Sequence, residues 1–223
     1  MSQTINDFSR PSSSLLQKFE GVSAALLHEA MGQRGALASD FKRVTSGGPC
    51  VGAALTIKAA PGDNLMLHKA ISLAQPGDVL VAAVDGFTDA GLWGEIATAA
   101  SMERGIRGLV TDGAVRDVDA VGEMGFAVFA RGVSMKGTSK KKGGSINLPI
   151  VIGGVYVQPG DIVVGDCDGV VVVPQSEAEE VLENAGRIEK REAKILREIR
   201  SGKLTLDLLD LRPTLRDLGL EQD

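Results

Sequence analysis

The amino-acid sequence predicts a single α/β domain, and three segments carry that prediction. Residues 92–117 combine a helical pattern with a short, apolar, β-branched strand, as in a βαβ unit. Residues 150–174 are rich in Val and Ile and are broken by Gly and Asp-Gly, which is typical of β-hairpins. Residues 176–200 read as one long, charged helix. We therefore expect an α/β domain with a mixed sheet and a long C-terminal helix.

The chain divides into a lead, a domain and an extension. Residues 1–13 are polar and are expected to form a flexible lead. The domain is expected over residues 14–175, beginning with a helix that Ser14 caps. Residues 176–223 form the extension, whose helix starts at a capping box of Ser and Glu at positions 176 and 179. We expect this extension to pack on the domain or on a neighbouring subunit.

The first half of the domain is expected to alternate helices with strands. A helix that starts near Gly21 or Ser23 is expected to end by Gly35. A strand over residues 51–60 and a Pro-Gly-Asp turn follow it. The next helix, over residues 64–74, places Asn64 and His68 one turn apart.

A turn and strand occur twice in similar form. Residues 75–86 and 158–169 share seven of twelve positions, and each begins with Gln-Pro-Gly-Asp and ends with Asp-Gly. Two copies are too few for a repeat architecture. We interpret them as one local structure, a turn followed by a strand, that occurs twice.

A helix entry opens the segment 92–117. Gly94 gives the backbone the freedom to turn into a helix, which is predicted over residues 96–106. Glu95 lies in the first turn of that helix, where the helix dipole favours a carboxylate.

Charged residues follow the next strand, which is predicted over residues 108–111. That strand would deliver Asp112 to the carboxyl edge of the sheet, beside Arg116 and Asp117. Together with Glu95, these oxygens suit a hard cation such as Mg²⁺ or Mn²⁺. Arg116 would contact a substrate carboxylate with two parallel hydrogen bonds.

Composition excludes several classes of protein. The net charge of −5 and the pI of about 5.2, without a basic face or aromatic platform, argue against a nucleic-acid binder. The sequence contains no GxGxxG motif or P-loop. No apolar run approaches the roughly 18 residues of a membrane span, and no leader pattern is present, so we expect a cytoplasmic protein.

The cysteines and the one basic run have simple interpretations. Cys50 and Cys167 form no ligand motif, so we expect two buried thiols and neither a zinc site nor a disulfide framework. The three lysines at positions 140–142 lie among glycines and are expected to form a solvated, mobile loop.

Five segments in combination resemble one family, the class II 4-hydroxy-4-methyl-2-oxoglutarate/4-carboxy-4-hydroxy-2-oxoadipate aldolases and the related RraA regulators of ribonuclease E. The segments are PGDNLMLHKA at 61–70, LWGEIATAA at 92–100, GLVTDGAVRD at 108–117, GVSMKGTSK at 132–140 and QPGDIVVGDCDGVVVVP at 158–174. The resemblance covers most of the chain. It implies a compact β/β/α swivelling-type domain that forms a homotrimer or hexamer, with the active site between subunits.

The resemblance also implies roles for the charged residues. Asp117 would bind the divalent metal, directly or through water. Arg116 would hold the substrate and stabilise the developing enolate. Glu192, on the last helix, would reach the site of a neighbouring subunit.

Further contacts to the substrate are implied at two loops. The backbone of Gly94, Glu95 and Ile96 would hold the pyruvyl carboxylate. Asn64 lies in the matching Pro-Gly-Asp-Asn turn. The chain departs from the active members at Glu95, because they commonly carry Asp there.

The implied activity is a Mg²⁺- or Mn²⁺-dependent aldolase that releases pyruvate from a small 2-oxo acid, either 4-hydroxy-4-methyl-2-oxoglutarate or 4-carboxy-4-hydroxy-2-oxoadipate. Glu95 or an ordered water would remove the proton of the C4 hydroxyl. Decarboxylation of oxaloacetate is expected as a side activity, and the breakdown of aromatic compounds as the setting.

Two alternatives stay open. Lys136 or one of the lysines at 140–142 would act through a Schiff base in a class I aldolase, which requires burial or a close cation. A non-catalytic, RraA-like regulator would bind a ribonuclease and would need no metal.

Overall fold

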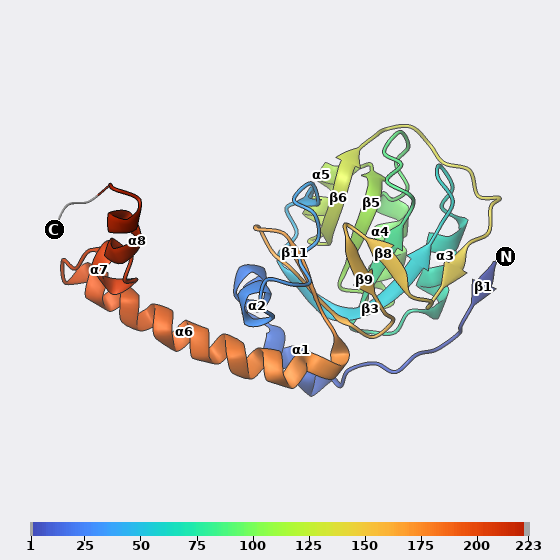
Figure 1. Cartoon of the computed structure of the whole chain (residues 1–223). Helices are drawn as coiled ribbons and strands as arrows, with labels where there is room; N and C mark the ends of the chain where they lie inside the picture. Colours follow the sequence, from blue (N-terminus) through green and yellow to red (C-terminus); the bar gives the residue numbers. More distant parts are fainter. Residues whose placement is uncertain (1, 221–223) are drawn as a thin grey trace.

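A mixed sheet with helices on one face forms the centre of the molecule in a computed structural model, which describes residues 2–220 (Figure 1). Four neighbouring strands of this sheet, β3 to β6, run parallel. From one edge to the other the strands are β1 (Gln3–Thr4), β7 (Ser145–Ile146), β3 (Cys50–Lys58), β4 (Asp78–Ala83), β5 (Gly108–Val115), β6 (Ala127–Val133) and β2 (Lys42–Arg43).

Two hairpins complete the β-structure. β10 (Ile162–Gly165) pairs antiparallel with the first half of β3 and with β11 (Val170–Val173). β8 (Ile150–Ile152) pairs with β9 (Val155–Val157) in a separate two-stranded sheet. The Val and Ile residues of β10 and β11 alternate between two buried faces, as expected for strands covered on both sides.

Three hydrophobic cores define the layers. The first lies between the central sheet and the helices α3 (Leu65–Leu73), α4 (Glu95–Met102) and α5 (Val118–Glu123). The second lies on the other face of the sheet, under the β8–β9 hairpin. The third joins the β10–β11 hairpin to α1 (Ser13–Phe19), α2 (Ala24–Ala30) and the start of α6 (Ala178–Arg200). This arrangement confirms the predicted β/β/α fold with a mixed sheet and a long C-terminal helix.

The N-terminal segment contacts the sheet, in contrast to the expected flexible lead over residues 1–13. β1 pairs with β7, and the backbone of Ile5 donates to Ile146 at 3.1 Å. Arg10 forms two hydrogen bonds of 2.8 and 2.9 Å to the buried carboxylate of Asp78. Residue 1 lies outside the described residues.

Two predicted helix caps are wrong. Ser12, not Ser14, accepts the hydrogen bond from Leu15 at the start of α1. The last helix is preceded by the short 3-10 helix η1 (Gln175–Glu177), and the side chain at its cap, Glu177, makes no capping hydrogen bond. The chain turns into this helix through η1, so the box of Ser176 and Glu179 does not form.

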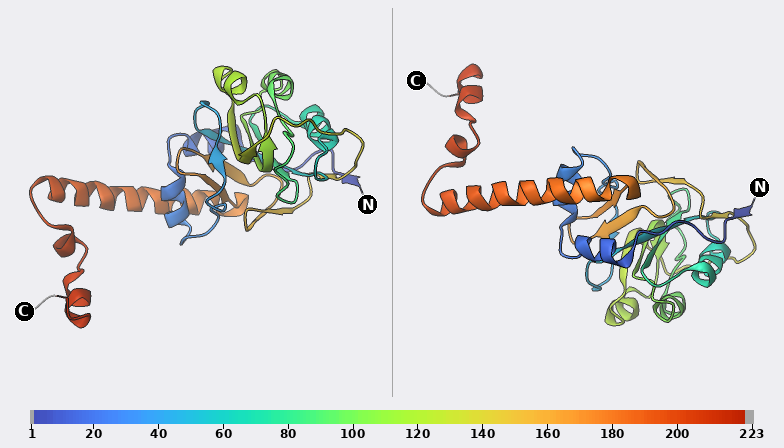
Figure 2. Two further views of the ribbon diagram at one scale, coloured as in Figure 1. Left: turned by 90° about the horizontal axis from the view of Figure 1, so that it is seen from above. Right: turned by 90° about the horizontal axis from the view of Figure 1, so that it is seen from below.

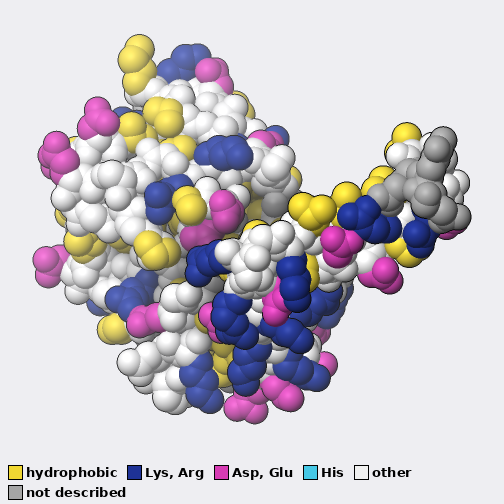
Figure 3. Space-filling view, turned by 90° about the vertical axis from the view of Figure 1, so that its left-hand side faces the viewer, with side chains coloured by type: hydrophobic (Ala, Val, Ile, Leu, Met, Phe, Trp, Pro, Cys, Tyr) yellow, Lys and Arg dark blue, Asp and Glu magenta, His cyan; other side chains and the backbone are white. Residues whose placement is uncertain are grey.

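The C-terminal part of the chain forms an arm that leaves the domain (Figure 2). Only the first turns of α6 are buried, through Ala178, Val181 and Ala185. Beyond them come α7 (Thr205–Leu208) and α8 (Arg212–Asp217). Figure 3 shows hydrophobic side chains exposed on this arm among Lys, Arg, Asp and Glu side chains. The exposed leucines of the arm are Leu196, Leu204, Leu209, Leu211, Leu218 and Leu220.

The cysteines differ in their surroundings. Cys50 is buried, as predicted, and burial raises the pKa of its thiol to about 12. Cys167 is exposed, because it lies at the tip of the β10–β11 turn, so the prediction of a second buried thiol is wrong. Among the described residues, no helix has the length and apolar character that crossing a membrane requires.

Candidate functional site

A pocket of about 200 Å³ lies at the carboxyl ends of the parallel strands. This edge is where open α/β sheets place their ligands. The lining comes from the connections that follow β3, β4, β5 and β6. The lining residues are Asn64, His68, Gly91, Leu92, Trp93, Gly94, Ile96, Ala97, Arg116, Asp117, Gly137, Thr138 and Lys140.

Arg116 and Asp117 follow β5 directly and form a charged pair at this pocket. The backbone N–H of Arg116 donates to the carbonyl of Trp93 at 2.8 Å, which fixes the end of the strand. The Arg116 Nε lies 3.5 Å from Asp117 Oδ2, and both side chains are about two-fifths exposed. Asp117 has a left-handed backbone, with a φ of 55°, as it caps the start of α5.

Asp117 also holds the N-terminus of α4. Its Oδ2 accepts a hydrogen bond of 3.2 Å from the backbone N–H of Glu95. Gly94 makes this contact possible, because a Cβ at that position would lie 2.3 Å from Asp117 Oδ2. Gly94 has an extended φ of −167°, so space and not backbone freedom accounts for the glycine. The backbone of Gly94, Glu95 and Ile96 was expected to hold a carboxylate of the substrate. Of these three residues, Glu95 already donates its N–H to Asp117.

Asn64 presents an unpaired oxygen at the pocket. Its side chain is 8% exposed, and its Nδ2 donates to the carbonyl of Leu92 at 2.9 Å. That hydrogen bond orients the amide, and the buried Oδ1 has no partner within the described chain. A buried acceptor without a donor is uncommon in folded proteins, so this oxygen is suited to accept from a ligand.

Asp63, which precedes Asn64, connects the start of α3 to the loop after β6. Its buried carboxylate accepts from the hydroxyl of Ser139 at 2.5 Å and from the backbone N–H groups of Lys141 and Lys142 at 2.6 and 3.1 Å. It also accepts from Leu65 at 3.0 Å. Burial disfavours the charged form, but these hydrogen bonds outweigh it and lower the pKa of Asp63 to about 2.

Two basic residues outside the metal-dependent assignment line the pocket, His68 and Lys140, and Lys140 was named only among the lysines of the class I alternative. Burial, and then the charge of Lys140, lower the pKa of His68. Lys140 reaches the pocket because its loop returns from β6 toward β3, where Ser139 lies beside Asp63 in a parallel bridge. For His68, the one signal in the sequence was its spacing from Asn64 on one helix.

Three predicted acidic groups lie outside the pocket lining. The side chain of Glu95 is exposed in the first turn of α4. Glu192 lies on the arm, in a different hollow beside α2, so its predicted role depends on a neighbouring subunit. Asp112 was expected at the sheet edge, but β5 continues past it and its buried carboxylate accepts from Val84 and Gly86. That expectation for Asp112 is wrong.

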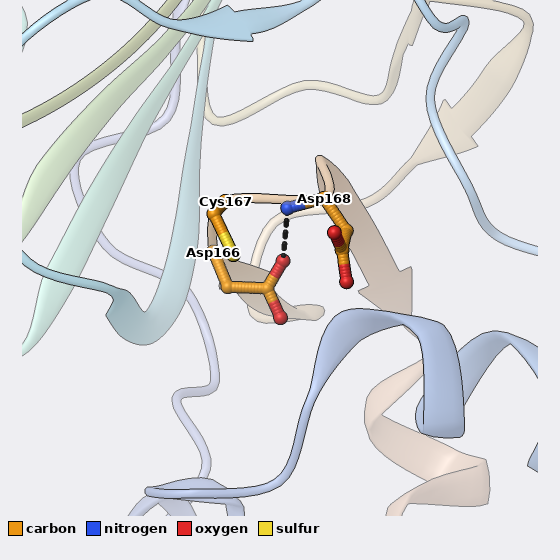
Figure 4. A group of neighbouring side chains, drawn as sticks. All are labelled: Asp166, Cys167 and Asp168. Carbon is orange, nitrogen blue, oxygen red and sulfur yellow. Dashed lines mark hydrogen bonds between the residues drawn. The ribbon is translucent and has the colours of Figure 1, made fainter.

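A cluster of two aspartates and a cysteine lies at the opposite end of the parallel strands, in the β10–β11 turn (Figure 4). It consists of Asp166, Cys167 and Asp168, and no other group of this kind occurs in residues 2–220. The carboxylate of Asp166 already accepts hydrogen bonds from Ala24, Asp168 and Gly169. These hydrogen bonds to Asp166 stabilise the β10–β11 turn and attach it to α2.

The lysines near the pocket are not buried. Lys136 is exposed and pairs with Asp89 at 2.7 Å. Lys140, Lys141 and Lys142 are also exposed. Exposure removes burial, one of the two ways to lower the pKa of a Schiff-base lysine, which counts against the class I alternative.

Comparisons with known proteins agree on one family. The family described as RraA-like, Aldolase/RraA, matches residues 23–172. A protein of Halalkalibacterium halodurans, named as a candidate 4-hydroxy-4-methyl-2-oxoglutarate aldolase, is 36% identical over 185 residues, which cover 83% of this chain and 85% of that protein.

Solved structures give the same fold. An uncharacterised protein from Pseudomonas syringae pv. tomato is 33% identical, with a TM-score of 0.81 over 93% of this chain and 97% of its own. A Streptomyces coelicolor protein, described as an unusual member of the RNase ES inhibitor RraA protein family, is 30% identical, with a TM-score of 0.74 over 84% of this chain and 98% of its own.

Proposed function

This chain belongs to the RraA-like family, Aldolase/RraA, and from that premise we propose that it is a divalent-metal-dependent aldolase. Its substrate is 4-hydroxy-4-methyl-2-oxoglutarate or 4-carboxy-4-hydroxy-2-oxoadipate, and its product is pyruvate. The observation that carries the proposal is the pair Arg116 and Asp117 at a pocket whose wall includes the N-terminus of α4. A cation, a carboxylate and a helix N-terminus suit a 2-oxo acid.

The oxygen donors of the pocket fit Mg²⁺ or Mn²⁺. Asp117 is the one carboxylate among the lining residues, and its Oδ1 makes no hydrogen bond to the described chain. Mg²⁺ commonly uses one or two carboxylates and keeps several waters, so one aspartate at an open pocket is sufficient. When bound, such an ion would withdraw electrons from the 2-oxo group and so favour cleavage beside it.

The residues of the chain would divide the remaining work. The guanidinium of Arg116 binds the substrate oxygens and stabilises negative charge as the C3–C4 bond breaks. Glu95 or an ordered water takes the proton of the C4 hydroxyl, and the C4 oxygen becomes the carbonyl oxygen of the second product. The electron pair of the broken C3–C4 bond forms the enolate of pyruvate. A proton returned to C3 then gives pyruvate. The same enolate arises when oxaloacetate loses CO₂, so we propose decarboxylation as a side activity.

The exposed arm supports a homotrimer or hexamer in which Glu192 completes a neighbour's pocket. Its apolar side chains, described above, find no cover within one chain. Uncovered apolar surface of this extent is typical of a surface that meets another chain.

Release of pyruvate, coupled to lactate dehydrogenase, tests the proposal. The two substrates are 4-hydroxy-4-methyl-2-oxoglutarate and oxaloacetate, each with Mg²⁺ and then with EDTA, and a reaction without protein corrects for spontaneous decarboxylation. We expect turnover of the first that depends on Mg²⁺. Absence of turnover with both Mg²⁺ and Mn²⁺ would contradict the proposal.

The second candidate is a regulator that binds a ribonuclease. It is favoured by the likeness to the Streptomyces coelicolor protein of the RNase ES inhibitor family. The two candidates differ in their dependence on Asp117. Replacement of Asp117 by Ala removes an aldolase activity, whereas binding through the outer surface would tolerate this change inside a pocket.

A further inference from the structure

We propose that Trp93 and Thr98 are positioning residues, and that the hydrogen bond between them fixes Arg116 and the first turn of α4 in place at the pocket. In this role neither side chain touches a ligand. The role rests on the proposed function, because it explains how the charged pair is held for that reaction. Its structural part can be measured without turnover.

The hydrogen bond between the two side chains is buried. The indole N–H of Trp93 donates to the hydroxyl oxygen of Thr98 at 2.7 Å, and the two residues are 1% and 0% exposed. Trp93 belongs to the core between the sheet and the helices α3, α4 and α5. An indole N–H in this place has no water to replace a lost acceptor, so breaking the contact is strongly unfavourable. The hydrogen bond therefore fixes the rotation of the ring, whereas apolar contacts have no preferred direction.

Thr98 holds the loop before α4 at two successive residues. Its backbone N–H donates to the carbonyl of Gly94 at 3.0 Å, and its hydroxyl accepts from Trp93. Gly94 precedes the helix without a capping side chain, so this helix start lacks the contact that usually fixes it. The contact between Trp93 and Thr98 supplies a restraint one residue earlier.

The loop that Thr98 holds contacts both members of the charged pair. The carbonyl of Trp93 accepts the backbone N–H of Arg116 at 2.8 Å. Two residues further along the chain, the N–H of Glu95 donates to Asp117 Oδ2 at 3.2 Å. A rotation of this loop would therefore displace Arg116 and Asp117 together.

The ring of Trp93 also connects α4 to the segment that follows α5. It stacks on Phe126, with ring centroids 6.1 Å apart and an angle of 13° between the ring planes. Phe126 is itself held, because its carbonyl accepts from the hydroxyl of Thr45 at 2.8 Å. One ring thus links α4 to the segment after α5, and both helices begin at the pocket.

Thr98→Val tests the pair in the full-length protein, because valine keeps the shape of threonine and removes the acceptor. With 4-hydroxy-4-methyl-2-oxoglutarate and Mg²⁺, we expect kcat for pyruvate release to fall about 10-fold or more, as for a misplacement of about 1 Å. The change in KM should be smaller. Thr98→Ser keeps the hydroxyl and should keep most of kcat. Trp93→Phe removes the N–H but keeps an apolar ring, and it should lower kcat as Thr98→Val does.

Thr56→Val is the matched control. Thr56 is also 0% exposed, and its hydroxyl donates to the carbonyl of Leu148 at 2.7 Å, away from the residues that line the pocket. This variant should lower the temperature of thermal unfolding and leave kcat unchanged. Equal losses of kcat in Thr98→Val and Thr56→Val would indicate a general loss of stability and would overturn the positioning role.

Two measurements report on the pair without turnover. Trp93 is the only tryptophan, so its fluorescence reports this position alone. Thr98→Val should shift the emission to shorter wavelength, because a hydrogen bond from the indole N–H lowers the energy of the emitting state. Hydrogen exchange at the amide of Arg116, followed by NMR, should become faster, because its acceptor is the carbonyl of Trp93. Thr56→Val should change neither.

The combined results separate this proposal from the proposed function. Unchanged exchange at Arg116 in Thr98→Val overturns the positioning role, and so does faster exchange with an unchanged kcat. Faster exchange in Thr98→Val, when the native chain releases no pyruvate, contradicts the aldolase and keeps the positioning role.

Discussion

The side chains at the pocket and those on the C-terminal arm find their partners in different ways. At the pocket edge, Asp63 is buried, and its carboxylate accepts hydrogen bonds from Leu65 and from the loop of Ser139, Lys141 and Lys142. In the described part of the arm, no side chain after Ala185 is buried. The geometry of the pocket is thus determined within one chain, whereas the arm offers its apolar side chains to a surface outside that chain.

Two glycines show the same contrast. Gly94 lies at the pocket, where an added Cβ would meet Asp117 Oδ2 at 2.3 Å. Gly186 lies in the middle of α6, where an added Cβ meets nothing within 4 Å. The first glycine is required by a contact, and the second is not required by any contact within the chain. Changes at the pocket edge should therefore affect chemistry, and changes in the arm should affect helix stability or assembly.

The largest effect is expected from Arg116→Ala and Asp117→Ala. Each should lower kcat/KM for pyruvate release at least about 100-fold, because each removes a charge that stabilises the transition state. Thermal unfolding followed by circular dichroism should change little, because both side chains are about two-fifths exposed. A variant that folds and keeps most of its rate would contradict the assignment of the site.

Glu192→Ala tests whether the arm contributes to the pocket of another copy. We expect kcat to fall about 100-fold, because the pocket of the neighbouring copy would lose a charged group close to the reacting atoms. Mixed assemblies of Glu192→Ala and Asp117→Ala subunits should recover part of the activity, because some pockets then combine both intact residues. Unchanged kinetics of Glu192→Ala would assign this residue to an exposed helix face.

Gly94→Ala tests the contact between Asp117 and α4. The added methyl should displace the Asp117 carboxylate and lower kcat/KM on the order of 10- to 100-fold, the effect of a misplacement of about 1 Å. Titration of Mg²⁺ in the activity assay should show weaker activation. Normal kinetics would mean that the carboxylate works from another position.

Asp63→Asn should weaken the connection between α3 and the loop of Lys140. We expect a several-fold rise in KM and a loss of about 1–3 kcal/mol in the free energy of unfolding, because buried donors lose a charged acceptor. The pKa of Asp63 lies below its usual 3.8, at about 2, so its ionisation stabilises the folded state above pH 3.8. That stability is lost as the pH falls toward 2. Chemical unfolding between pH 5 and about 2 should show a shallower acid loss for Asp63→Asn than for the native chain, and equal slopes would contradict this role.

The smallest effect is expected from Gly186→Ala. Alanine should raise the free energy of unfolding by about 0.5–1 kcal/mol, because glycine is unfavourable inside a helix. Thermal unfolding measures the change, and pyruvate release is the control that should stay constant. A loss of stability would show that another chain contacts Gly186 closely.

The sequence predicted those site residues whose positions follow from strand order. Asn64, Gly94, Arg116 and Asp117 each follow a parallel strand, and such strand ends meet at one edge. Asp112 was misplaced because β5 runs on through an irregular pairing after Thr111.

The positions that the sequence did not place depend on tertiary contacts. Lys140 reaches the pocket through a long loop that returns from β6 toward β3, a path that Figure 1 shows and that local pattern does not encode. The exposure of Cys167 likewise depends on the position of a hairpin tip. The sequence predicted the arm as a charged helix. The point at which the arm leaves the domain could not be predicted, because it depends on which apolar side chains of the helix find a partner within the domain.

The left-handed backbone of Asp117 limits how this position can change in evolution. With a φ of 55°, it favours Asn, Asp and Gly, and among these only aspartate carries a negative charge. Glutamate would keep the charge but would fit the backbone less well and would reach one carbon further. Asparagine and glycine fit this backbone but remove the one carboxylate among the residues that line the pocket. Such a change would leave the fold in place without this charge, and the fold would then be free to serve another purpose.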